Sequence, residues 1–146
     1  MKNIPSLAHT MAFAEECHRG HLDKSGVMYV LHPLQVMRQM KTETEKIVGV
    51  LHDIVEDTPI TLQDLRQKGY SEEIVEAIDC LTKREGENYE DFIERCKKNP
   101  IAMKVKIADL EDNMDIRRLD VLTEKDTERL NRYLRAWRYL TRDEPM

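Results

Sequence analysis

The chain has 146 residues, of which 40% are hydrophobic and 35% are charged, and its formal net charge is −5. This length suits one domain around one core, so we expect a single domain over residues 1–146. The negative charge argues against binding of a nucleic-acid polymer, which needs an extended basic surface. No apolar run approaches the roughly 20 residues of a membrane span, so no membrane contact is expected. One small anionic ligand in a local basic pocket stays compatible with this composition.

The N-terminal residues show no signal-peptide pattern. The cysteines, Cys17, Cys80 and Cys96, are odd in number and have no C-x-x-C spacing, so neither a disulfide framework nor a cysteine zinc site is expected. Together these features predict a cytoplasmic protein.

Apolar residues recur at helical spacing along most of the chain, and β-branched residues do not alternate at period two. A first helix is predicted at about 4–18, followed by a loop over 20–31. Pro33 suits the first position of a second helix, about 33–41, and biases His32 toward extended geometry. The predicted helices that follow lie at about 43–56, from Thr61 to near Gly69, from Ser71 onward, at 89–97, from the cap Asn99-Pro100 to about 113, and at 126–141.

This pattern predicts an all-α fold, a compact orthogonal helical bundle. Its core is expected over about 4–119, with a C-terminal helix over about 126–141. The last helix carries Tyr133, Trp137 and Tyr139, which we interpret as packing residues for the core or for a homodimer.

The segment 50–58 concentrates one imidazole and three carboxylates in a helical, otherwise apolar stretch that ends at Thr58-Pro59. Like charges one turn apart destabilise a helix, and acids near its C-terminal end oppose the macrodipole. A positive partner is therefore expected for Asp53, Glu56 and Asp57, and a divalent metal is the first candidate. His52 and Asp53 leave a helix about 100° apart, so one ion can reach both side chains. The alternative interpretation is a solvated pair on a helix surface.

Two further ligands are candidates elsewhere in the chain. His32 stands at the predicted helix start, and Asp109 interrupts an apolar run, where burial of an unpartnered carboxylate is costly. Asp109 has an alternative use as an ion-pair partner of Lys106. Mixed nitrogen and oxygen donors suit Mn²⁺, Fe²⁺ or Zn²⁺, and such an ion acidifies bound water and polarises a phosphoryl oxygen.

His32, His52-Asp53 and Asp109 match the H…HD…D pattern of HD-domain metal-dependent phosphohydrolases. Three segments, 18–33, 51–58 and 106–113, also resemble the hydrolase domain of RelA/SpoT-type enzymes, in the same order. The resemblance extends over about 9–119 and includes no synthetase domain, so the chain is similar to the small stand-alone hydrolases of this group.

The resemblance implies an HD-type fold and removal of the 3′-pyrophosphate from guanosine tetra- or pentaphosphate by attack of metal-bound hydroxide. The expected ion is Mn²⁺, with Fe²⁺, Zn²⁺, Co²⁺ and Ni²⁺ as alternatives. By the same resemblance, the metal ligands are His32, His52, Asp53 and Asp109, and the residues that handle the attacking water are Glu56 and Asp57. The candidate substrate contacts are Arg19, Lys24, Ser25, Lys106 and Asn113.

The chain departs from the family pattern at several positions. Asp23 stands where the family has a guanine-binding arginine, Leu110 replaces an arginine, and Asp112 replaces a histidine. Two alternatives follow: another nucleotide phosphohydrolase or phosphodiesterase on the same metal site, and a non-catalytic nucleotide sensor.

Overall fold

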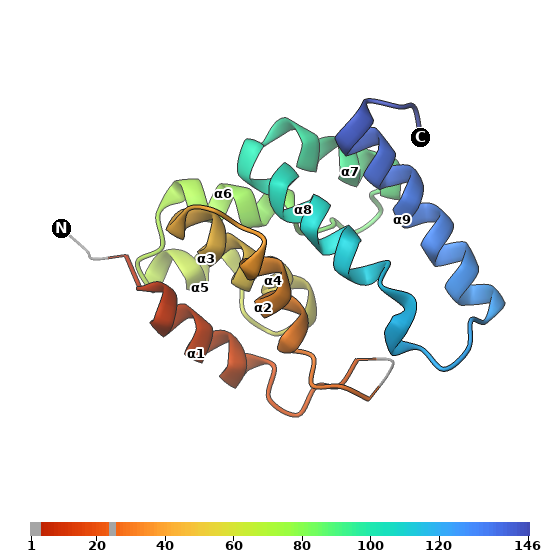
Figure 1. Ribbon diagram of the computed structural model, residues 1–146. Helices are drawn as coiled ribbons and strands as arrows, with labels where there is room; N and C mark the ends of the chain where they lie inside the picture. Colours follow the sequence, from red (N-terminus) through yellow and green to blue (C-terminus); the bar gives the residue numbers. More distant parts are fainter. Residues whose placement is uncertain (1–3, 24–25) are drawn as a thin grey trace.

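The computed structural model describes residues 4–23 and 26–146, and within these ranges the chain forms helices joined by loops (Figure 1). The elements are α1 (Leu7–Cys17), α2 (Leu31–Arg38), α3 (Glu43–Leu51), α4 (Ile54–Asp57), α5 (Leu62–Gln67), α6 (Glu72–Cys80), α7 (Tyr89–Lys98), α8 (Pro100–Asn113), the short 3-10 helix η1 (Ile116–Arg118) and α9 (Glu124–Arg142). The described residues form no strand beyond an isolated antiparallel bridge between Leu22 and Met28. The predicted all-α class is confirmed.

Helix α8 is the central element of the bundle, because it packs against α2, α3, α6, α7 and α9. The C-terminal helix α9 runs beside α8 along one side of the molecule (Figure 1). One cluster of buried side chains joins these helices, and α9 contributes Ala136 and Leu140 to it. None of the described helices combines the length and the apolar composition that a membrane span needs.

Local capping chemistry explains where most helices begin. Capping boxes start three of them: Thr42 pairs with Glu45, Thr61 with Asp64, and Thr123 with Asp126. The Ser71 hydroxyl caps α6, and the Asn99 side chain caps α8 ahead of Pro100. The starts predicted at Thr61, Ser71 and Asn99-Pro100 are therefore confirmed.

The prediction of a single helix over 43–56 is wrong, because the helix is interrupted at His52 and Asp53. Helix α3 ends at Leu51, Asp53 has φ −117° and ψ 7°, and α4 begins at Ile54. The imidazole Nδ1 of His52 bonds to the carbonyl oxygen of Gly49 at 2.7 Å, the group that would accept the Asp53 amide in a continuous helix. Glu56 and Asp57 therefore lie in the only turn of a new helix, and the expected opposition to a long helix dipole does not arise.

The second helix also differs from its prediction. It begins at Leu31 and ends at Arg38, so His32 is helical and not extended. Pro33 is then the third helical residue, a position whose amide has no partner within the helix, so proline costs no hydrogen bond there. The amide of His32 donates to the carbonyl of Tyr29 at 3.0 Å, which closes the first turn.

Candidate metal centre and active site

Three buried side chains from three separate segments of the chain converge at one point. His32 lies on α2, His52 follows the end of α3, and Asp109 lies on α8. One potential ligand atom from each lies within 4.8 Å of the others. Oδ1 of Asp109 is 2.7 Å from Nε2 of His32 and 3.3 Å from Nε2 of His52. Because α8 packs on both α2 and α3, the packing of the bundle creates this cluster.

Both imidazoles use their outer nitrogen for orientation and turn the inner one toward the cluster. Nδ1 of His52 donates to the Gly49 carbonyl, and Nδ1 of His32 lies 2.6 Å from Oδ2 of Asp112. A carbonyl oxygen only accepts, so Nδ1 of His52 carries a proton, and Nε2 is the nitrogen left for a metal ion to bind. This is the arrangement that metal-binding histidines adopt.

The electrostatics at this point favour positive charge. Burial lowers the pKa of His32, but hydrogen bonds to Asp109 and Asp112 outweigh this effect and raise its pKa to about 10. Burial likewise opposes ionisation of His52, yet the charges of Asp53 and Asp109 hold its pKa above the ordinary value. For Asp109, burial is outweighed by Lys106 and His52, which keep its pKa well below the usual range. The carboxylates thus create the field that a cation site requires.

Asp53 is buried beside this cluster but outside the three-residue group. Its Oδ2 lies 3.8 Å from Nε2 of His52, and its Oδ1 lies 3.6 Å from Nε2 of His18. Among the described residues, neither Oδ1 of Asp53 nor either ring nitrogen of His18 has a hydrogen-bond partner. A buried carboxylate oxygen without a donor is costly, and a metal ion at the cluster would offset that cost.

The predicted water-handling acids lie next to Asp53. The Tyr29 hydroxyl bonds to Asp53 and also contacts Oδ2 of Asp57 at 2.9 Å, so it bridges the two carboxylates. Oε1 of Glu56 accepts the backbone amide of Lys83 at 2.6 Å. Burial raises the pKa of both acids, and the neighbouring Asp53 raises that of Asp57 further. Carboxylates with raised pKa values are suited to accept a proton near neutral pH.

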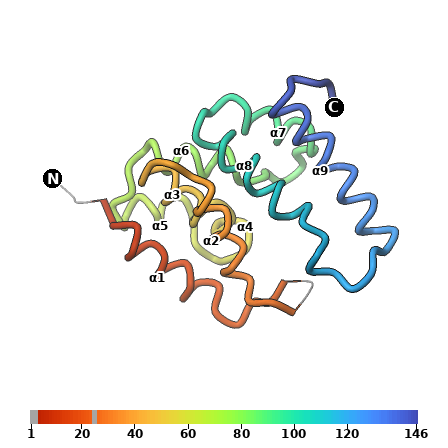
Figure 2. The backbone as a smooth tube through the Cα atoms, in the orientation of Figure 1, coloured from red at the N-terminus to blue at the C-terminus, as the bar shows by residue number. Residues whose placement is uncertain are grey.

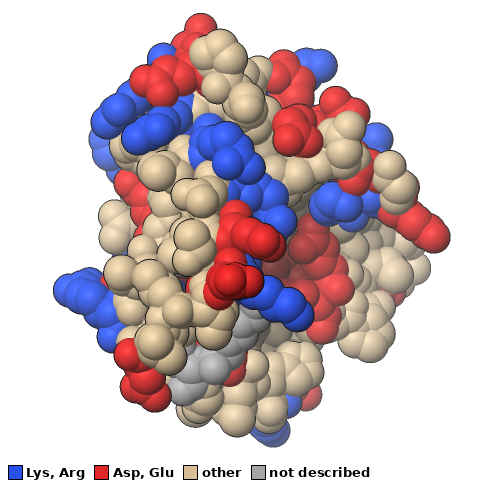
Figure 3. Space-filling model, turned by 90° about the vertical axis from the view of Figure 1, so that its right-hand side faces the viewer, with Lys and Arg blue, Asp and Glu red and all other residues tan. Residues whose placement is uncertain are grey.

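These groups line a cleft of about 440 Å³, here called the inner cleft. Lys83, Lys106 and Arg132 lie among its acids, so the cleft offers cations as well as potential metal ligands. The face seen in Figure 3 shows acidic side chains gathered in a hollow, with Lys and Arg side chains beside them. Such mixed charge suits a phosphate group bound together with a metal ion.

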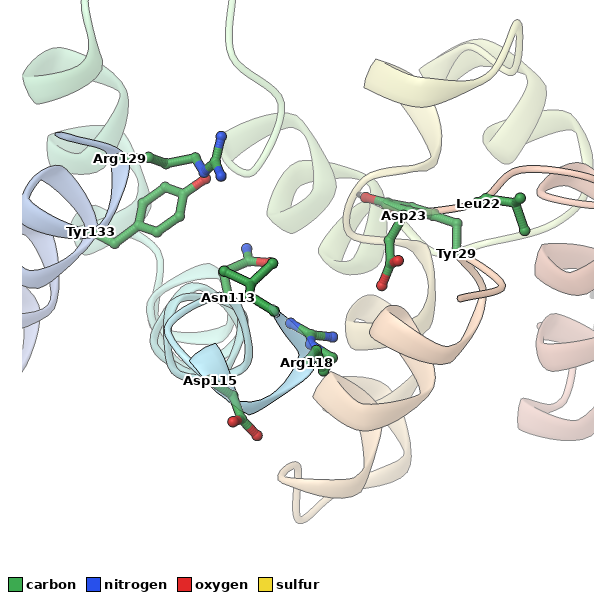
Figure 4. Close-up of a pocket in the computed structure, with 9 residues that line it drawn as sticks. Leu22, Asp23, Tyr29, Asn113, Asp115, Arg118, Arg129 and Tyr133 are labelled. Atoms are coloured by element: carbon green, nitrogen blue, oxygen red, sulfur yellow. The ribbon is translucent and has the colours of Figure 1, made fainter. Parts of the chain in front are cut away.

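A second space of about 300 Å³, the outer cleft, adjoins the inner one and shares Tyr29, Asn113 and Tyr133 with it. Figure 4 shows Asp23 and Tyr29 on one side, Arg129 and Tyr133 of α9 on the other, and Arg118 between them. Residues 18–23 and 26–30 and the segment after α8 supply several of these residues, and they lie at the lower edge of the molecule in Figure 2. The two clefts together can hold a ligand longer than one phosphate.

The predicted substrate contacts have different positions. Nδ2 of Asn113 donates to Oδ1 of Asp109 at 3.0 Å, and Nζ of Lys106 bonds Oδ2 at 2.9 Å. Both residues line the inner cleft while also holding the carboxylate of Asp109. Arg19 is exposed, pairs with Glu15 at 3.2 Å and is not among the residues that line either cleft. Lys24 and Ser25 lie outside the described residues.

Sequence reasoning missed several residues of the site. Tyr29 and His18 stand in the motif segment 18–33, but no role was predicted for them; their contacts with Asp53 appear only in three dimensions. Asp112 was noted only as a departure from the family pattern. Tyr133 packs against the core, as predicted, and it also lines both clefts, which was not predicted. Leu110, another departure, is fully buried in the core and does not line either cleft.

Comparison with known proteins supplies an independent line of information. No family model matches the chain. It is 32% identical over 125 residues to the bifunctional (p)ppGpp synthase/hydrolase SpoT of Escherichia coli, an alignment that covers 76% of this chain and 18% of that protein. A GTP pyrophosphokinase of Myxococcus xanthus is 30% identical over 136 residues, which cover 81% of this chain and 18% of the relative. The chain is related to the SpoT enzymes.

The relationship confirms the resemblance that the motifs predicted, although the chain spans less than a fifth of the length of these two relatives. Among solved structures, the chain is similar to a metazoan orthologue of SpoT that is described as hydrolysing ppGpp. The TM-score is 0.77 at 18% sequence identity, over 96% of this chain and 87% of the other. At this identity the similarity shows a shared fold, which agrees with the predicted HD-type bundle.

Proposed function

We propose that this protein is a metal-dependent phosphohydrolase that removes the 3′-pyrophosphate from guanosine tetra- or pentaphosphate. The observation that carries the proposal is the convergence of Nε2 of His32, Nε2 of His52 and Oδ1 of Asp109 in a cleft beside Glu56 and Asp57. The substrate is taken from the relatives, whose names describe synthesis or hydrolysis of this class of nucleotide.

The proposed metal ligands are His32, His52, Asp53 and Asp109. The donor set fits a divalent ion, because two imidazoles and two carboxylates suit Mn²⁺, Fe²⁺ or Zn²⁺, and because Oδ1 of Asp53 lacks a donor among the described residues. We take Mn²⁺ as the first candidate, with Fe²⁺, Zn²⁺, Co²⁺ and Ni²⁺ as alternatives. When bound, such an ion polarises a phosphoryl oxygen and lowers the pKa of water.

The chain's own residues supply the remaining chemistry. In this proposal Glu56 and Asp57 orient the attacking water and accept its proton, which their raised pKa values favour. Tyr29 holds Asp57 against Asp53. Lys83, Lys106 and Arg132 lie where their charges can offset those of a pyrophosphate in the inner cleft.

The outer cleft is the proposed position of the nucleoside. Asn113 and Tyr133 lie where the two clefts join, so they are placed to contact the sugar or the base. One observation favours a second candidate function, hydrolysis of a different nucleotide. The acid Asp23 lines the outer cleft, at the position where the motif that the chain resembles has an arginine.

A nucleotide panel tests the proposal. Protein purified without chelators is analysed for its metal content, loaded with that metal and incubated with guanosine tetraphosphate and other phosphorylated nucleotides. The proposal expects release of pyrophosphate and GDP from guanosine tetraphosphate. Release of inorganic phosphate or of a nucleoside monophosphate from another member would favour the second candidate. No turnover of any nucleotide in the panel would contradict both candidate enzymatic functions. Binding without turnover would then favour a nucleotide sensor.

Two variants test the assigned acids. Glu56→Gln and Asp57→Asn should each lower kcat by roughly 10²–10⁴-fold, the usual contribution of a general base. Metal content and nucleotide affinity should stay close to wild type, because neither acid is a proposed ligand. Glu85→Gln is the matched control, since Glu85 is an exposed acid that does not line either cleft. Wild-type turnover of both test variants would contradict the assignment.

A further inference from the structure

One carboxylate outside the proposed ligand set contacts a proposed ligand directly. Asp112 lies on α8, three residues after Asp109, and this spacing places both acids on the same side of the helix. Oδ1 of Asp109 lies 2.7 Å from Nε2 of His32, and Oδ2 of Asp112 lies 2.6 Å from Nδ1. Two carboxylates of one helix therefore contact the two nitrogens of the same imidazole ring.

Asp112 is itself held in position by Arg118, which follows α8 in η1. The guanidinium of Arg118 donates to the backbone oxygen of Asp112 at 2.9 Å and lies 3.5 Å from its Oδ2. The side chain of Asp112 is 19% exposed and that of Arg118 is 35% exposed, so the pair is partly shielded from water. The contacts form a chain from Arg118 through Asp112 to His32.

The two histidines of the cluster are therefore supported differently. His52 donates its Nδ1 hydrogen to a neutral backbone carbonyl, whereas His32 faces a carboxylate. A carboxylate acceptor holds the hydrogen on Nδ1, orients the ring and makes Nε2 a better donor to a metal. The motif that the chain resembles has histidine where this chain has Asp112.

We propose that Asp112 is a positioning residue of the metal centre, which holds the ring and tautomer of His32 so that Nε2 faces the ion, and that Arg118 holds Asp112 in turn. This inference rests on the proposed metal-dependent function. Loss of such a supporting acceptor typically weakens metal binding about 10–100-fold.

The test uses the full chain with Asp112→Ala, Asp112→Asn and Arg118→Ala. Affinities for Mn²⁺ and Co²⁺ are measured by competition with a chromophoric chelator, and the visible spectrum of the Co²⁺-loaded protein reports the ligand geometry. Asp112→Ala should weaken binding about 10–100-fold and alter the spectrum. Asp112→Asn should lose less, because its amide oxygen still accepts from Nδ1, and Arg118→Ala should also lose less.

Glu111→Gln is the matched control, because this exposed neighbour contacts Trp137 and none of the proposed ligands. At saturating metal, Asp112→Ala should recover most of its turnover, since Asp112 acts only through His32. Wild-type affinity and an unchanged spectrum in Asp112→Ala would overturn the inference and leave the proposed function intact. Should that variant not fold, wild-type affinity in Asp112→Asn and Arg118→Ala would overturn it. A wild-type protein that binds no divalent ion would overturn both.

Discussion

Nε2 of His32 lies 2.7 Å from Oδ1 of Asp109, although 77 positions separate the two residues in the chain. The contact exists because α2 and α8 pack against one another, and α3 brings His52 to the same oxygen. The candidate metal centre is thus a product of the bundle core. Metal binding at this point should stabilise the packed helices, because the unfolded chain has no such site.

The ion pair between Lys106 and Asp109 predicts that the free energy of unfolding and the metal affinity can be changed independently of one another. The two side chains are only 12% and 7% exposed, so Asp109→Asn leaves a lysine with little water and no carboxylate. Breaking a buried pair in this way costs about 3–5 kcal/mol. Adding Lys106→Met should restore much of this free energy of unfolding without restoring metal affinity. Urea denaturation and metal titration of the single and double variants check the prediction; equal stability of the two would contradict it.

The bridge that Tyr29 makes between Asp53 and Asp57 predicts an effect on kcat. Tyr29→Phe removes the hydroxyl but keeps the ring, and a hydrogen bond to a charged group is worth about 1.5–3 kcal/mol. We expect kcat to fall about 10–100-fold with little change in KM, measured with the substrate found in the nucleotide panel. Tyr70→Phe is the control, since its hydroxyl bonds Thr10, neither residue lines either cleft, and the change should affect stability alone. A change confined to KM would contradict this role.

The absence of a side chain at Gly49 allows α2 and α3 to approach one another closely. A Cβ atom at this position would lie 3.2 Å from Cα and 3.3 Å from the backbone nitrogen of Met37 on α2. Backbone atoms cannot rotate away, so Gly49→Ala should push the two helices apart. We expect a loss of about 1–3 kcal/mol in the free energy of unfolding. Metal affinity should fall as well, because α2 carries His32 and α3 leads directly into His52. Unchanged urea midpoint and affinity would show that the helices adjust freely.

The pair formed by Glu87 and Arg95 predicts a pH-dependent part of the stability. Hydrogen bonds from Arg95 lower the pKa of Glu87 from 4.5 to about 2. A depressed pKa stabilises the folded state fully above the unfolded value, and this stabilisation disappears as the pH falls from about 4.5 to about 2. The Tm of the wild type should therefore exceed that of Glu87→Gln near neutral pH, and the difference should shrink across this window. A constant difference would contradict the assignment.

Local signals along the sequence determined the class of the fold and the positions where many of its helices begin. Helical periodicity indicated the all-α bundle, and cap residues such as Thr61, Ser71 and Asn99 indicated where helices begin. These features depend on residues three or four positions apart, which is why they can be read without a structure. The chemistry of the candidate ligands is likewise a property of residue type and motif.

Only the tertiary structure decided how the site is arranged. The break between α3 and α4 depends on a side chain bonding a backbone carbonyl, and periodicity does not report such a bond. Tyr29 meets Asp53 across 24 positions, and Asp112 meets His32 across 80. Arg19 lies only ten positions from Tyr29, yet its side chain points to Glu15 and does not reach the clefts. Contacts at such separations follow from how helices pack, so the sequence determined which groups are present and the packing determined which of them meet.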